Sequence, residues 1–149
     1  MTLEERIRSD LVKAMKEEDV TRRTILRFIL AGIKNAEKAQ QKPQDDAAVI
    51  DVLTKEVKRH HESIEAFEKG NRIDLVEKEK AELAIINEYL PEQISRDEII
   101  AAAKKAIEEV NATGPRDKGT VMSSLMPHMK GRADGKEVNE IVTELLNAL

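Results

Sequence analysis

The chain has 149 residues, of which 36% are charged and 40% hydrophobic, and its formal net charge is −4. It contains no cysteine, which excludes disulfides, thiolate metal sites and a cysteine nucleophile. Its only aromatic residues are Phe28, Phe67 and Tyr89, too few for the stacking platform that usually holds single-stranded RNA. The abundance of helix-forming residues favours packed helices over sheets.

Helical periodicity and capping residues divide the first 90 residues into four predicted helices. Thr2 and Glu5 form a capping box before the first helix, which begins near Leu3. Asp19 is the expected N-cap of the second helix. The second, third and fourth helices cover approximately residues 20–38, 46–69 and 73–89. The third and fourth are expected to pair antiparallel through the turn at Gly70.

Pro91 marks the predicted domain boundary, because proline pushes the preceding residue out of the helical region. Three more helices are expected to begin after Ser95, near Asp117 and after Asp134, and Ser95 with Glu98 is expected to form a second capping box. Pro127 is expected to end or kink the middle one. The sequence thus predicts an all-α protein: a four-helix N-terminal domain, 1–90, with a long antiparallel helix pair, and a small three-helix tail-like domain, 91–149.

The second predicted helix carries a row of basic residues, which we call the basic stripe: Arg23, Arg27, Lys34 and Lys38. At about 100° per residue they fall within an arc of about 60°, opposite the apolar face of that helix. Two interpretations stay open. The stripe is either the ordinary solvated side of an amphipathic helix or a secondary surface for phosphate groups.

A second group of basic residues lies in the predicted tail domain: Arg116, Lys118, Lys130, Arg132 and Lys136. These five positive charges stand against only Asp117 and Asp134, which gives a local charge of +3. Because the N-terminus of a helix attracts anions, the group predicts a nucleic-acid-binding corner at the start of the last helix. The alternative is a tight helix–helix turn with glycine at its two positions of positive φ. Asp134, as the expected cap of the last helix, would occupy the same backbone donors.

No catalytic residue, cofactor or metal site is predicted. His60 and His61 are adjacent and point about 100° apart on a helix, so they cannot share one metal ion. Glu56 and His60 have a suitable spacing, as do His61 and Glu65, but no second cluster of ligands is visible in the sequence. We expect His60 to be a hydrogen-bonded histidine of the core or of an interface.

Four stretches together carry a family resemblance: Lys69-Gly-Asn-Arg-Ile-Asp-Leu75; Glu88-Tyr-Leu-Pro-Glu-Gln-Ile-Ser95; Lys118-Gly-Thr-Val-Met122 with Met126-Pro127; and Lys130-Gly-Arg-Ala-Asp-Gly135 with Val138-Asn139. They resemble the GatB/YqeY family over essentially the whole chain, and most closely its free-standing YqeY-like members. The C-terminal part alone is similar to the tail domain of the B subunit of the tRNA-dependent amidotransferase. His60 and His61 depart from the family pattern, because the family resemblance leads us to expect cationic residues at these two positions.

The resemblance implies an all-α fold and a tRNA-binding or tRNA-amidation accessory protein without its own catalytic centre. In the amidotransferase the tail domain touches the tRNA, and a separate catalytic domain, which has no counterpart here, does the chemistry. The expected tRNA contacts are Lys130, Arg132 and Lys136, with Arg116 and Lys118 as outer contacts. Two alternatives remain: an adaptor that docks on an amidotransferase or aminoacyl-tRNA synthetase through an apolar groove between the two domains, and, by family transfer, a carbon–nitrogen ligase with glutamine as amido donor.

The compartment is predicted from the lack of cysteine and from the N-terminal residues. Residues 1–6 are charged from the start and lack the apolar stretch of a secretory signal. No segment approaches the ~20 apolar residues that a membrane span requires. We therefore expect a cytoplasmic protein in a reducing compartment, with no membrane partner.

Overall fold

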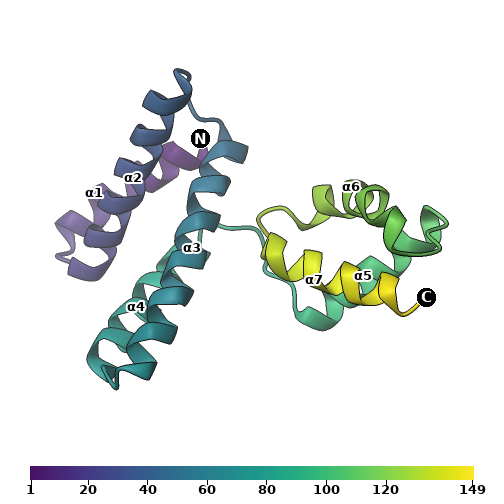
Figure 1. Ribbon diagram of the computed structural model, residues 1–149. Helices are drawn as coiled ribbons and strands as arrows, with labels where there is room; N and C mark the ends of the chain where they lie inside the picture. Colours follow the sequence, from purple (N-terminus) through teal and green to yellow (C-terminus); the bar gives the residue numbers. More distant parts are fainter. The chain divides into compact units, whose positions relative to one another are not determined.

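The computed structural model describes residues 1–149 and consists of helices joined by short turns (Figure 1). The elements are α1 (Leu3–Lys16), α2 (Val20–Gln40), α3 (Asp46–Lys69), α4 (Ile73–Asn87), α5 (Arg96–Glu109), the short 3-10 helix η1 (Pro115–Asp117), α6 (Lys118–Met129) and α7 (Gly135–Asn147). There is no strand, so the predicted all-α fold is confirmed. None of the helices combines the length and apolar character needed to cross a bilayer.

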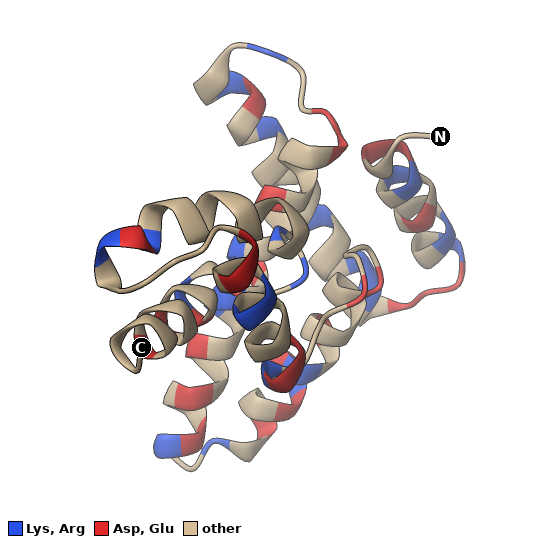
Figure 2. Cartoon of the chain, turned by 90° about the vertical axis from the view of Figure 1, so that its right-hand side faces the viewer, with Lys and Arg blue, Asp and Glu red and all other residues tan.

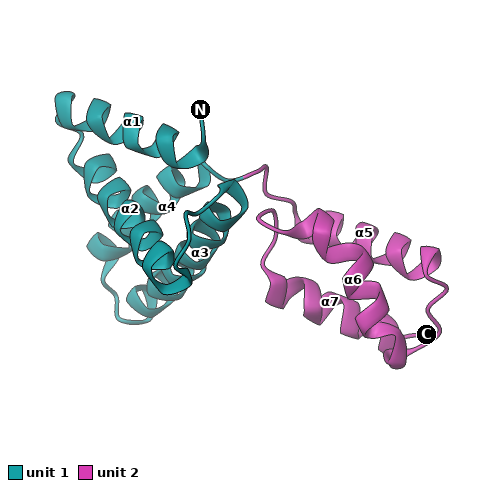
Figure 3. Cartoon of the chain, turned by 90° about the horizontal axis from the view of Figure 1, so that it is seen from above, with its two compact units in different colours: residues 1–90 teal, residues 91–149 magenta.

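The chain divides into two compact units, residues Met1–Leu90 and Pro91–Leu149 (Figure 3). In the first unit α1 packs on α2, and α3 pairs with α4 through the turn that follows Lys69. The buried core of this unit is made by Ile7, Ile25, Leu26, Ile29, Ile33, Val49, Leu53, Ile85, Ile86 and Tyr89. In the second unit α5, α6 and α7 pack around Ile99, Ala103, Val121, Leu125, Val138, Ile141, Val142 and Leu146.

The predicted capping residues begin the helices as expected, with one exception. The Thr2 and Glu5 capping box is complete, and the Asp19 side chain accepts a hydrogen bond from the Arg22 N–H. At α5, Ser95 accepts from the Glu98 N–H, but no reciprocal bond from the Glu98 side chain is present. The bond that the cap side chain accepts from the backbone therefore forms at all three helices, whereas the reciprocal side-chain bond of a capping box forms only at α1.

Pro127 does not end α6, which continues to Met129. The residue at the end of the helix explains this, because Met129 is only 3% exposed and belongs to the core of the second unit. The next turn also closes normally, with a 3.0 Å hydrogen bond from the Lys130 N–H to the Met126 carbonyl. Burial of Met129 therefore compensates for the donor that Pro127 lacks. The chain reverses after α6 at Gly131, whose φ of 77° favours glycine.

Candidate functional site

The four residues of the basic stripe all lie within α2. Arg27, Lys34 and Lys38 are exposed, Arg23 is half-buried, and none of the four makes a salt bridge within the first unit. The Arg27 guanidinium contacts only the Met15 sulfur, at 3.8 Å. The stripe consists of two pairs, Arg23 with Arg27 and Lys34 with Lys38. The members of each pair are one helical turn apart, and the whole stripe extends about 22 Å along the helix. On most helices Lys and Arg are interspersed with Asp and Glu (Figure 2). In α2 the one acidic residue is Glu37, next to Lys38.

The five basic residues of the second unit do not form one cluster. Arg116 lies in η1 and Lys118 begins α6, whereas Lys130, Arg132 and Lys136 lie around the turn between α6 and α7. The two groups are at opposite ends of α6, which at 12 residues is about 18 Å long. The structure therefore separates the expected outer contacts from the main group.

Arg132 is engaged inside its own unit. Its Nε donates to the Glu92 carbonyl at 3.4 Å, and its Nη1 donates to the His128 carbonyl at 3.2 Å. Gln93 fastens the same turn by donating from Nε2 to the Gly131 carbonyl at 2.7 Å. Arg132 and Gln93 thus hold the α6–α7 turn against the segment that precedes α5, a structural role that the sequence analysis did not predict.

The N-terminus of α7 is capped from within the chain. The Asp134 carboxylate accepts a hydrogen bond from the Lys136 N–H at 3.1 Å, so one of the backbone donors expected to meet an anion is already satisfied. The Lys136 and Lys130 side chains are exposed at this corner. Of the two interpretations of the corner, the tight turn describes its backbone, but only Gly131 has a positive φ, because Gly135 is already the first residue of α7.

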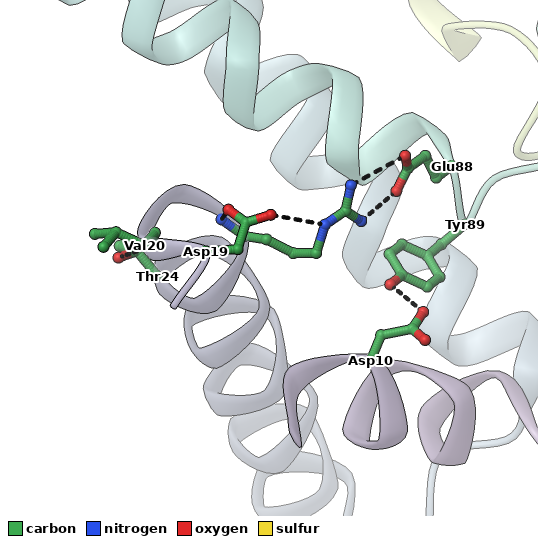
Figure 4. Close-up of polar contacts among 7 residues, drawn as sticks. Asp10, Asp19, Val20, Thr24, Glu88 and Tyr89 are labelled. Atoms are coloured by element: carbon green, nitrogen blue, oxygen red, sulfur yellow. Dashed lines mark hydrogen bonds and ion pairs between the residues drawn. The ribbon is translucent and has the colours of Figure 1, made fainter. Parts of the chain in front are cut away.

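Two residues of the Glu88–Ser95 stretch form a polar junction between α1, α2 and the end of α4 (Figure 4). The Tyr89 hydroxyl donates to the Asp10 carboxylate at 2.5 Å, and the Arg22 guanidinium makes two hydrogen bonds to Glu88, at 2.5 and 3.2 Å. Burial, together with the bond to Asp10, raises the pKa of Tyr89 well above its ordinary value. The hydrogen bond to Glu88 likewise raises the pKa of Arg22. This part of the family motif is therefore structural.

A pocket that the sequence analysis missed lies between α2, α3 and α4 and has a volume of about 230 Å³. His60 of α3 is 7% exposed, and its Nε2 lies 3.4 Å from a carboxylate oxygen of Glu79 and 3.8 Å from one of Glu82, both on α4. Glu56 also lines the pocket, and its Oε2 is buried without a hydrogen-bond partner. The group His60, Glu79 and Glu82 has the donor types of a metal site.

One signal in the sequence could have indicated this pocket. His60 precedes Gly70 by ten residues and Glu79 follows it by nine, so an antiparallel pairing through that turn brings them to the same level. Glu79 and Glu82 are also three residues apart, which places them on one face of α4. We expected no metal because ligands were sought within one helix, whereas the structure brings them together across two.

Three relatives have the name "altered inheritance of mitochondria protein 41, mitochondrial". The protein of Pyrenophora tritici-repentis is 34% identical over 96% of this chain and 80% of its own length. The protein of Lachancea thermotolerans is 40% identical over 73% of this chain and 60% of its own length. The protein of Eremothecium gossypii is 38% identical over 72% of this chain and 60% of its own length. The chain thus matches less than two thirds of the length of the last two.

These names contradict the predicted cytoplasmic location, because they assign the relatives to mitochondria. The prediction depended on the lack of cysteine and on the charged N-terminal residues. Neither feature distinguishes one internal compartment from another, since both report only on disulfides and on secretion. The cytoplasmic location is therefore withdrawn.

The sequence resemblance to the YqeY-like proteins is confirmed by a comparison that covers nearly the whole chain. The family model described as "Yqey-like protein" matches residues 4–146. This range contains all seven α-helices except Leu3, the first residue of α1, and Asn147, the last residue of α7. The Pyrenophora relative independently matches across both compact units. The chain belongs to the YqeY-like protein family.

Proposed function

We propose that this chain is an accessory protein that binds folded tRNA through the basic stripe of α2, while a separate enzyme performs the amidation chemistry. One observation carries the proposal: four cationic side chains lie along one helix face and none makes a salt bridge to an acidic group of that unit. Lys130 and Lys136, both exposed, form a second contact region in the other unit. The resemblance of the C-terminal part to the amidotransferase tail domain supports tRNA as the ligand of this second region, and the charge of the stripe supports the same ligand for α2.

The chemistry of the stripe suits a folded RNA rather than a single strand. Lysine and arginine that neutralise phosphates release condensed counterions, which gives affinity without sequence preference. Of the aromatic residues only Phe28 is markedly exposed, at 51%, so base stacking cannot supply the affinity. Contacts to phosphates and 2′-hydroxyls of a folded backbone remain as the mode of binding.

The test is equilibrium binding of purified chain to labelled tRNA, comparing two doubly substituted variants. Arg27→Glu with Lys34→Glu reverses two charges of the stripe. Lys69→Glu with Lys105→Glu reverses two exposed lysines that already pair with Glu65 and Glu109. Both variants change the net charge by the same amount, so only the position of the charge differs.

The stripe variant is expected to bind tRNA at least about 10-fold more weakly than the control variant, because it loses two phosphate contacts and adds two repulsive charges. Equal losses in the two variants would mean that net charge, and not the stripe, determines binding. Amide formation from glutamine by the purified chain alone would contradict the accessory role.

A second candidate, an adaptor that docks on the amidotransferase or a synthetase, is favoured by one feature. Phe28 is exposed beside a groove of about 300 Å³ between α2 and α3, which Lys55 and Arg59 also line. An exposed aromatic side chain at a groove is a common anchor of protein interfaces. If the adaptor role holds, Phe28→Ala abolishes association with the enzyme. The association of the unsubstituted chain with the enzyme depends only weakly on salt, and the chain alone shows almost no binding to tRNA.

A further inference from the structure

We propose that His60, Glu79 and Glu82 bind a divalent transition-metal ion of the zinc type. This inference is independent of tRNA binding, because it concerns the interior of the α3–α4 pair and uses none of the residues of the basic stripe. The three side chains converge from two helices: His60 from α3, and Glu79 and Glu82 from successive turns of α4. His60 and Glu82 are 7% and 8% exposed, so the pocket holds these polar groups away from bulk water.

The spacing of the donor atoms fits one ion. The Nε2 atom of His60 lies 3.4 and 3.8 Å from the nearest oxygens of Glu79 and Glu82, and all three donors lie within 4.8 Å of one another. Donor atoms bound to a tetrahedral Zn²⁺ at about 2.0–2.1 Å are about 3.3–3.4 Å apart. Small rotations of the glutamate side chains are therefore sufficient to close the site, with no movement of the helices.

The hydrogen bond on the other side of the imidazole orients it for coordination. His60 Nδ1 lies 2.9 Å from the Glu56 carbonyl oxygen, and because a carbonyl can only accept, Nδ1 carries the proton. In the neutral ring Nε2 then presents its lone pair towards two carboxylates. A cation between them converts this repulsion into coordination, and a backbone carbonyl bonded to the distal ring nitrogen is a usual partner of metal-binding histidines.

Glu56 supplies a second, separate observation. Its side chain is 9% exposed, and its Oε2 atom is shielded from solvent, accepts no hydrogen bond and lies 3.8 Å from His60 Nδ1, the ring nitrogen opposite the proposed ion. Arg59 pairs at 3.0 Å with the other oxygen, Oε1. A buried carboxylate oxygen without a hydrogen-bond donor is costly and rare, so the interior around His60 favours a nearby positive charge. Glu56 also adds negative potential to the three proposed ligands.

The donor set selects the class of metal. One imidazole nitrogen with two carboxylates suits zinc and neighbouring first-row metals, whereas Ca²⁺ and Mg²⁺ favour shells made only of oxygen. Three protein ligands would leave a fourth position of a tetrahedral ion for water or another small ligand. Thr24 and Ser63 are the hydroxyl residues that line this space.

The test is calorimetric titration of the chelator-treated, intact chain with ZnCl₂ alone. The natural sequence provides a matched control, since His61 is the adjacent histidine on α3 and is exposed. We expect one zinc site in the unsubstituted chain and in His61→Ala, and an affinity at least about 10-fold lower in His60→Ala. Glu79→Gln, which preserves the size of the side chain, is expected to weaken binding to a similar degree.

A second readout guards against a variant that does not fold. Four-coordinate Co²⁺ in such a site absorbs visible light much more strongly than hydrated Co²⁺, so at equal Co²⁺ concentration the Glu79→Gln variant, checked for helical content by circular dichroism, should show a weaker band than His61→Ala. Absence of zinc binding to the unsubstituted chain would overturn the proposal. So would equal zinc affinity in the His60→Ala and His61→Ala variants, which would show an adventitious site on the surface.

Discussion

The basic stripe of α2 and the α6–α7 turn carry similar charges in the sequence but differ in what those charges do. Along α2, Arg23, Arg27, Lys34 and Lys38 make no salt bridge within their unit. At the turn, Arg132 donates to two backbone carbonyls and Asp134 caps the next helix. The comparison teaches that a count of Lys and Arg measures charge, whereas the hydrogen-bond partners of each side chain decide which charges are available to a ligand.

The same distinction holds within α2 itself. Arg22 precedes the stripe by one residue but points to Glu88, with which it makes two hydrogen bonds, and its Nε lies 3.5 Å from Asp19 (Figure 4). It joins the start of α2 to the end of α4. One helix therefore holds a structural arginine beside arginines that face solvent, and this gives the comparison an internal control.

The largest expected effect separates the two basic regions. Arg27→Glu with Lys34→Glu should weaken tRNA binding by about 10- to 100-fold, and Lys130→Glu with Lys136→Glu by only a few-fold, because the stripe offers more phosphate contacts. Fluorescence anisotropy of labelled tRNA at constant salt measures both. A larger loss in the tail variant would reverse the ranking and return the tRNA surface to the second unit.

Arg132 tests whether the turn is structural. Arg132→Ala should lower the free energy of unfolding of the second unit by about 1–2 kcal/mol, since two charge-assisted hydrogen bonds to carbonyls are lost. Arg132→Lys keeps the charge but not the two-pronged geometry, so it should lose stability and keep tRNA affinity. Urea unfolding followed by circular dichroism gives the stability. Unchanged stability in both variants would mean that the guanidinium is not needed by the turn.

Tyr89 provides a control that changes stability without changing charge at neutral pH. Tyr89→Phe removes the hydrogen bond to Asp10 and should cost about 1 kcal/mol of stability, while tRNA affinity stays the same. If tRNA affinity fell as well, loosening of the α1–α2–α4 junction, and not charge, would explain the stripe variants.

The same residue predicts a pH dependence with a defined sign. The folded state raises the pKa of Tyr89 above its ordinary value of 10.0, so it holds the phenol proton more tightly than the unfolded chain does. The resulting stabilisation is complete below pH 10 and is lost as the pH rises towards the folded-state pKa. Tyr89 is the only tyrosine and there is no tryptophan, so ultraviolet absorbance of tyrosinate reports on it alone. Tyrosinate that forms near pH 10 in the folded chain would contradict the raised pKa.

The smallest effect is expected for Arg22. Its side chain is 29% exposed and that of Glu88 is 48% exposed, so solvent screens the pair and Arg22→Ala should cost about 0.5–1 kcal/mol. The affinity for tRNA should not change, because this guanidinium is turned towards Glu88. If Arg22→Ala lost as much tRNA affinity as Arg27→Ala, the ion pair with Glu88 would not determine which arginines contact tRNA.

Local signals in the sequence predicted most of the fold, and long-range pairings account for what was missed. Thr2, Asp19 and Asp134 were identifiable because a cap involves residues only two or three apart. The contact between Arg132 and Glu92 joins residues 40 apart, and its geometry depends on how the second unit closes. The pocket around His60 likewise requires the pairing of α3 with α4, so a search for ligands within single helices could not find it.

The salt dependence of tRNA binding tests the central claim most directly. The logarithm of the affinity, plotted against the logarithm of the salt concentration, falls with a slope set by the number of phosphates contacted, about 0.9 for each in a duplex. For Arg27→Glu with Lys34→Glu we expect this slope to be less steep by about 2 than for the unsubstituted chain, and for Lys69→Glu with Lys105→Glu we expect no change. Equal slopes for all three proteins would contradict the assignment of the tRNA contacts to α2.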